Sequence, residues 1–152
     1  MKRKINIFLA LFLSIVSAIC LFACGGKDKS QLECTLVEST ETRVVISVTN
    51  EGKNCTLLDC MEILKGEDFT YEVSSGMVTS INGVTNPADY SKCWMLYTSD
   101  AEMANTAWGT TEYDGETLGS AIVGADALEV LTGCIYVWEY RSFDYITGAG
   151  TR

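Results

Sequence analysis

Three carboxylates alternate around a glycine in the second half of the chain. They are Glu112, Asp114 and Glu116, with Gly115 among them. Side-chain oxygens at this spacing could bind calcium, but the distal bidentate glutamate of a complete calcium loop is missing. A solvated acidic loop is therefore the favoured interpretation of this segment.

Cysteine is the second residue type in this chain that could carry out chemistry. Five cysteines follow position 24, namely Cys34, Cys55, Cys60, Cys93 and Cys134. An odd number excludes complete internal pairing. Buried free thiols and one or two disulfides both stay open. Zinc is the weakest of the alternatives, because the chain has no histidine and no second cysteine pair at ligand spacing.

The sequence argues against catalysis. A cysteine nucleophile would need a histidine base, which this chain lacks. Ser120 stands outside a Gly-x-Ser-x-Gly frame, and no carboxylate pair carries a signal of a buried cleft. We therefore predict that the protein is no enzyme, so that a small hydrolase is the least favoured function, and that it uses no cofactor and no metal.

The N-terminus predicts export. Lys2-Arg3-Lys4 precede an apolar run over residues 5–22, and Ala23-Cys24 follow, which is the order of a secretory signal with its cleavage site. Leu21 to Cys24 resemble the lipobox of bacterial lipoproteins, although Phe22 replaces the usual small residue. The resemblance implies that the thiol of Cys24 receives a diacylglyceryl group and becomes the mature N-terminus.

An uncleaved transmembrane anchor is the alternative, since a run of about 18 apolar residues is at the short limit for spanning a bilayer. In either case the remainder is expected outside the cytoplasm, held at the cell membrane. Without residues 1–23 the chain keeps eight of its 11 basic residues and all 20 acidic ones, a net charge of −12. So acidic a chain repels nucleic acid, which is excluded as a partner.

One helix is predicted. Thr56 and Asp59 have the spacing of a capping box. Leu57, Leu58, Met61 and Leu64 then share one face, and Gly66 is expected to end the helix.

Strands are predicted elsewhere from β-branched and alternating residues, over 43–49, 69–73, 77–81, 93–98 and 134–141. A tight turn is expected at Asn82-Gly83, and a long surface excursion over 99–120. Together these elements predict an α+β fold, a mixed sheet packed on a single helix. The predicted organisation is a signal peptide (1–23), a lipidated, flexible tether (24–42), one domain (43–142) and a tail (143–152).

The last strand carries the candidate binding residues. Tyr136, Trp138 and Tyr140 share one of its faces, while Ile135 and Val137 share the other. The aliphatic face is assigned to the core. The aromatic face either meets a ligand or packs under the 99–120 excursion, and packing is the favoured alternative.

Three further aromatic residues are candidates for ligand binding. Trp94 and Tyr97 should face opposite sides of their strand, so that one of them is core. Trp108 should be exposed on the excursion.

The succession of motifs resembles a family of bacterial surface domains similar to the C-terminal domain of transcobalamin. It runs from Thr56-Leu57-Leu58-Asp59 through Phe69-Thr70-Tyr71, Ser80-Ile81-Asn82-Gly83-Val84 and Trp94-Met95-Leu96-Tyr97 to Gly124-Ala125-Asp126 and the closing segment 133–140. The resemblance covers about residues 43–142 and implies a β-grasp-like fold. In the vitamin carriers the related domain closes over cobalamin. Their large α-barrel has no counterpart here, and no histidine is present to coordinate cobalt.

Two functions therefore follow as expectations. The first is a lipid-anchored extracellular binding or adhesion module that recognises a surface protein, a glycan or a small molecule. The second is an accessory lipoprotein that binds cobalamin or another corrinoid for uptake.

Overall fold

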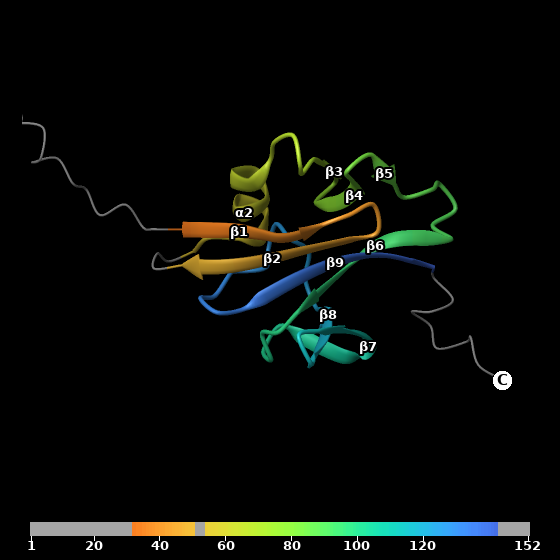
Figure 1. Ribbon diagram of the computed structural model, residues 1–152. Coiled ribbons are helices and arrows are strands. Elements are labelled where there is room, and N and C mark those ends of the chain that lie inside the picture. The colour runs from red at the N-terminus through yellow and green to blue at the C-terminus, as the bar shows by residue number, and fades with distance from the viewer. Residues whose placement is uncertain (1–31, 51–53, 143–152) are drawn as a thin grey trace, which may run out of the picture.

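The structure, a computed structural model, describes residues 32–50 and 54–142 (Figure 1). The described part is mostly β-sheet with a single short helix, which is the coarse α+β class that was predicted. Its elements in chain order are β1 (Leu32–Ser39), β2 (Arg43–Asn50), α2 (Leu57–Leu64), β3 (Tyr71–Ser74), β4 (Met77–Ile81), β5 (Val84–Thr85), β6 (Lys92–Thr98), β7 (Ala104–Tyr113), β8 (Glu116–Ala121) and β9 (Ile135–Ser142). The signal segment, Cys24 and the tail 143–152 lie outside the described residues.

The strands form two sheets. The main sheet has the order β1-β2-β9-β6-β8-β7, and the small sheet has the order β3-β4-β5. All ladders between described strands are antiparallel, so the prediction of a mixed sheet is wrong. The central strand β9 comes from the C-terminal end of the described chain and pairs with β2 from its start.

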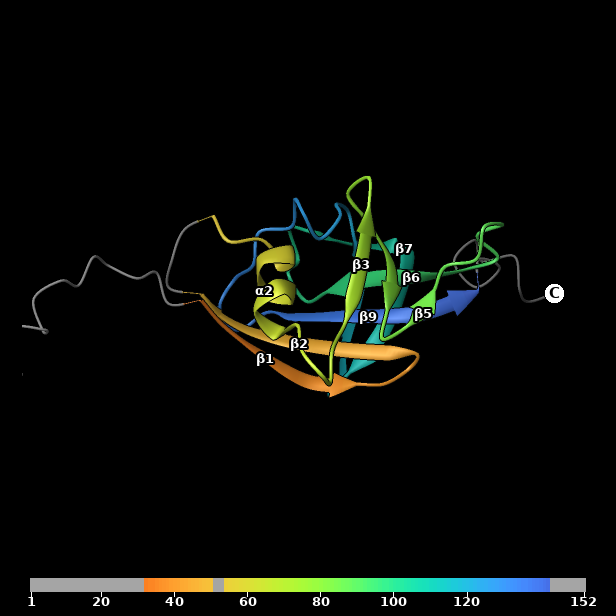
Figure 2. The same ribbon diagram turned by 90° about the horizontal axis from the view of Figure 1, so that it is seen from above.

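The main sheet is covered on both faces. Figures 1 and 2 place α2 and the small sheet on one face, and the β7–β8 hairpin turns away toward the other side. β8 pairs with β6 only at Tyr97 and Thr98, so the hairpin can diverge from the plane of the other strands. We call the face under α2 the helix face and the opposite one the hairpin face.

The helix begins as its sequence predicts. The side chain of Thr56 accepts from the backbone N–H of Asp59, and the Asp59 carboxylate accepts from the backbone N–H of Thr56 at 2.8 Å, which completes the capping box. The next free N–H groups of the first turn bond to a distant loop, since Leu57 donates to the Leu128 carbonyl and Leu58 to the Ala125 carbonyl. The helix ends at Leu64, before Gly66, and its apolar side packs on the sheet.

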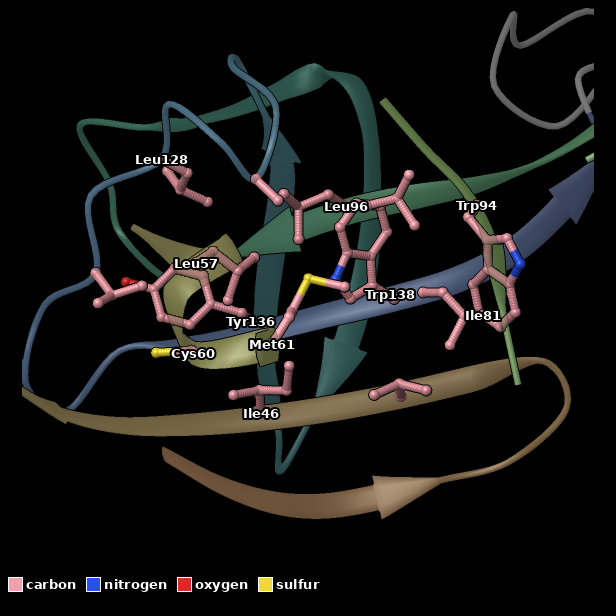
Figure 3. Close-up of a cluster of buried hydrophobic side chains, with 14 of the residues drawn as sticks. Ile46, Leu57, Cys60, Met61, Ile81, Trp94, Leu96, Leu128, Tyr136 and Trp138 are labelled. Carbon is pink, nitrogen blue, oxygen red and sulfur yellow. The ribbon is translucent and has the colours of Figure 1, made fainter. Parts of the chain in front are cut away.

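The larger core cluster lies on the helix face and contains the aromatic row of β9 (Figure 3). Tyr136 is fully buried and Trp138 is 4% exposed. Each has an apolar cross-strand neighbour, since Ile46 lies opposite Tyr136 and Leu96 lies opposite Trp138. Assigning only the aliphatic face of β9 to the core is therefore wrong, because α2 and the small sheet cover the aromatic face.

A second cluster lies on the hairpin face. Val45, Tyr97, Leu118 and Val137 are buried there, and Ile135 packs against them. Both faces of β9 are thus core. The prediction that the aromatic face packs under the 99–120 excursion is therefore wrong. The aliphatic face meets Leu118 of that excursion instead.

The excursion itself is a β-hairpin, which the sequence did not predict. β7 and β8 are joined by a two-residue turn at Asp114-Gly115, where both residues have positive φ (47° and 81°). The same turn chemistry joins β4 to β5 at Asn82-Gly83, as predicted.

The tether was predicted to reach residue 42, and this boundary is wrong. Residues 32–39 form β1, which pairs with β2 along its length. Leu32, Cys34 and Leu36 alternate with exposed residues and pack against the larger core cluster, so the sheet begins well before residue 43. Within the described ranges no helix is long and apolar enough to span a membrane.

Candidate functional site

An apolar groove of about 370 Å³ opens on the helix face, between β6 and the small sheet. Its volume is within the range of small-molecule sites. The lining comes from Gly76, Met77, Val78, Asn86, Tyr90, Cys93, Trp94, Met95, Leu96, Ala121, Gly124, Ala125 and Trp138. Two of the predicted candidates, Trp94 and Trp138, are among these residues.

Trp94 is locked in place. Its indole Nε1 donates to the carbonyl of Val84 at 2.7 Å, and its backbone N–H donates to the Asn86 side chain at 2.9 Å. The Asn86 amide nitrogen in turn donates to the Val78 carbonyl. Asn86 therefore joins β6 to the small sheet and fixes the wall of the groove. Its side-chain oxygen and nitrogen are both used in this role.

Trp138 contributes an unusual polar atom. Its indole Nε1 is buried and has no hydrogen-bond partner. A buried N–H without an acceptor costs about 1–3 kcal/mol. That atom has almost no accessible surface, so a molecule in the groove would meet the ring of Trp138 and not this N–H.

Two exposed side chains stand at the groove. Met77 is 56% exposed and Tyr90 is 53% exposed, although both are large and largely apolar. Such side chains supply adaptable contact area to a ligand. Neither residue was predicted from the sequence as a ligand contact. The only local signal was their type, because Met77 opens a strand and Tyr90 falls in an irregular loop.

Two glycines of the groove lining make room for the Asp126 carboxylate. Gly76 and Gly124 lie close together, and an added Cβ on either would come within 3.0 Å of that carboxylate. Gly76 also needs its positive φ of 81° for the turn between β3 and β4. Gly124 lies in the segment Gly124-Ala125-Asp126, one of those that carry the family resemblance. That segment does not predict the contact with Gly76.

The remaining candidates fall elsewhere. Tyr97 faces the hairpin side and is buried, so Trp94 and Tyr97 do face opposite sides, but both are core. Tyr136 lies deep under α2, where burial raises the pKa of its phenol and its oxygen accepts from the Leu131 N–H at 3.0 Å. Tyr140 packs against Trp94, and neither tyrosine lines the groove.

Trp108 is 53% exposed, as expected. It lies in residues 106–109, where the pairing of β7 with β8 skips from Asn105 to Thr110. Trp108 is not part of the groove lining. The structure therefore does not bring Trp108 and the β9 aromatic row together into one surface.

The polar side chains of the hairpin face form a closed network. Glu139 pairs with Arg43 at 2.9 Å and with Arg141, and it accepts from the Thr111 hydroxyl at 2.7 Å. Arg43 and Arg141 also donate to β7 carbonyls, those of Glu112 and Thr110. This network holds β7 on the sheet, and its charged groups are paired with one another.

The acidic segment 112–116 forms the end of the β7–β8 hairpin. Glu112 accepts from the Thr117 hydroxyl at 2.7 Å, and Asp114 occupies the turn. Among residues 32–50 and 54–142, no three His, Cys, Asp or Glu side chains are placed to hold a metal ion.

Comparison of this chain with protein-family models, with curated proteins and with solved structures finds no match.

Proposed function

We propose that this protein is a lipid-anchored extracellular module that binds a small, largely apolar molecule in the groove between β6 and the small sheet. The observation that carries the proposal is the groove itself, about 370 Å³ with an apolar lining that includes two tryptophans. The apolar lining of an open groove stays in contact with water, so covering it with a largely apolar ligand is favourable.

The lining also suggests what the ligand looks like. Apolar side chains and small residues favour a flat or branched hydrocarbon body. A glycan fits less well, since the side-chain oxygen and nitrogen of Asn86 are already bonded within the protein.

Export and lipid attachment at Cys24 are part of the proposal, and the N-terminal sequence pattern supports them. Kinship with the β-grasp-like domains is a proposal as well. Its support is the resemblance together with one helix packed on a face of an antiparallel sheet. The resemblance makes a corrinoid the first molecule to test in the groove.

The test is a titration of the full-length chain in lipid vesicles with cobinamide and with a panel of small apolar compounds. Binding would be followed by quenching of tryptophan fluorescence and by calorimetry. Met77→Glu places a charge at the groove and should weaken binding at least tenfold. Ile63→Glu is the matched control, because Ile63 is 57% exposed on α2 and is not in the lining.

Equal affinity in the Met77→Glu and Ile63→Glu variants would reject the groove as the site. Binding of apolar compounds without binding of cobinamide would keep the groove and remove the corrinoid. No binding by any compound of the panel would count against the proposed function.

A further inference from the structure

Three of the cysteines converge where α2 meets β1. Cys34 lies on β1, Cys60 lies on α2, and Cys55 lies just before the helix. Cys60 is fully buried in the larger core cluster, and Cys34 and Cys55 pack against that cluster. All are free thiols in the structure.

Cys34 and Cys60 lie close enough for their thiols to interact, and both belong to the packing between α2 and the helix face of the sheet. The backbone explains this proximity. Alternation along β1 points Cys34 toward the helix face, where it sits opposite the buried Val48 of β2. The helix places Cys60 on its sheet-facing side, between Leu57 and Met61, which are also buried.

We propose that Cys34 and Cys60 form a disulfide that ties β1 to α2. A disulfide needs two cysteines on backbones that can approach without rearrangement, and this pair faces the same packed boundary between β1 and α2. The other described cysteines have different neighbours. Cys93 contacts the Met95 sulfur at 3.5 Å, and Cys134 lies near Ser99 and Tyr136.

The bond forms by two exchange steps with an external disulfide as the oxidant. The Cys34 thiolate attacks that disulfide and expels one thiolate, which leaves a mixed disulfide on Cys34. The Cys60 thiolate then attacks the Cys34 sulfur and expels the second thiolate. Two electrons pass to the external disulfide, which becomes two thiols once it takes up the two protons that Cys34 and Cys60 release. Cys34 is the entry point, because it is partly exposed and Cys60 is not.

Burial raises the pKa of both thiols, and each thiol lies near the carboxylate of Asp59, which raises them further. Because the thiolate is the reactive form, oxidation of the folded chain should be slow at neutral pH and accelerate as the pH rises. Reduction reverses these steps, so a reducing thiolate attacks the Cys34 sulfur and expels the Cys60 thiolate; the raised pKa of the Cys60 thiol makes it a poor leaving group, and reduction should be slow. The bond therefore behaves as a structural tie.

The test is to incubate the full-length chain with glutathione disulfide at pH 8.5, alkylate the remaining thiols in denaturant, and map the peptides without reduction. We expect a peptide pair joined through Cys34 and Cys60. We also expect a melting temperature about 10 °C above that of the reduced chain, because the bond closes a loop of intermediate length. Cys34→Ala should lose both effects, and Cys93→Ala should keep both.

A second variant separates the pair from its neighbour. Cys55→Ala should still form the bond between Cys34 and Cys60. Alkylation of both residues after prolonged oxidation would overturn the proposal. A bond that joins Cys55 to either partner in the unmutated chain would overturn it as well. Even if a variant fails to fold, the peptide map of the unmutated chain shows whether Cys34 and Cys60 are joined.

Discussion

The ring of Trp94 packs against the ring of Tyr140 with their centroids 5.4 Å apart, and both side chains donate to the same short strand, β5. Trp94 bonds to the Val84 carbonyl at 2.7 Å, and Tyr140 bonds to the Thr85 carbonyl at 3.3 Å. Two aromatic residues that the sequence marked as ligand contacts thus hold the small sheet against the main one. Their polar atoms serve the fold, and only the Trp94 ring takes part in the groove.

These two bonds should differ in strength. Trp94→Phe keeps much of the ring packing and removes the shorter, part-buried bond, leaving the Val84 carbonyl without this donor, so we expect a loss of about 1–2 kcal/mol in the free energy of unfolding. Tyr140→Phe removes the longer bond and should cost less, about 0.5 kcal/mol. Urea unfolding followed by circular dichroism measures both. A larger loss for Tyr140→Phe would contradict this account of the contact.

The network around Glu139 should be costly to break. Glu139→Gln removes the charge that Arg43 and Arg141 share, and we expect a loss of about 3 kcal/mol. Thr111→Val deletes only the neutral donor and should cost about 1 kcal/mol. Hydrogen exchange checks the location of the effect, because the amides of the β7–β8 hairpin should lose protection first. Uniform loss of protection over all strands would show that the network has no special role at the hairpin.

Tyr71 gives the fold a dependence on alkaline pH. Burial and the 2.7 Å bond from its hydroxyl to the Glu62 carboxylate raise the pKa of Tyr71 to about 12. The folded state thus favours the protonated phenol. The resulting stabilisation is complete below pH 10, the ordinary pKa of tyrosine, and is lost as the pH rises toward 12.

Glu62→Gln removes the negative acceptor and should lower the pKa of Tyr71. Near-ultraviolet absorbance titration, with Tyr71→Phe subtracted, isolates the signal of this phenol. Glu67→Gln is the control, because no contact joins Glu67 to the Tyr71 hydroxyl in this structure. An unchanged pKa in the Glu62→Gln variant would exclude the carboxylate as a cause.

Lipid attachment depends on one thiol. Cys24→Ser should abolish acylation, because an oxygen in place of sulfur is no acceptor for the thioether bond that the lipobox resemblance implies. Intact-mass measurement of the membrane fraction should show the acyl chains and the loss of residues 1–23 in the unmutated chain only. Detection of the full-length chain without acylation would favour the uncleaved anchor instead.

Local signals were sufficient for much of this fold. The Thr56 capping box, the Asn82-Gly83 turn and the strands from β4, β6 and β9 each follow from neighbouring residues. The same kind of signal was present in β1, where Leu32, Cys34 and Leu36 alternate with polar residues. The predicted tether nevertheless included this segment, because it follows a polar stretch and carries two glutamates.

Local signals could not predict the groove, nor which face of β9 packs against α2. β9 has two apolar faces, and which of them meets α2 depends on where a hairpin 14 residues upstream crosses the sheet. That hairpin buries few large side chains, Leu118 foremost, so its sequence is typical of a surface loop. The contact between Gly76 and Gly124 joins distant segments, which no local pattern reports.

The pairing of β2 with β9 also constrains how the chain can fold during synthesis. β2 leaves the ribosome long before its partner, which ends at Ser142. Until then the centre of the sheet has a missing strand, and pairings so remote in sequence form slowly. The main sheet can therefore close only after β9 has been made, so the hydrophobic core on both of its faces forms last.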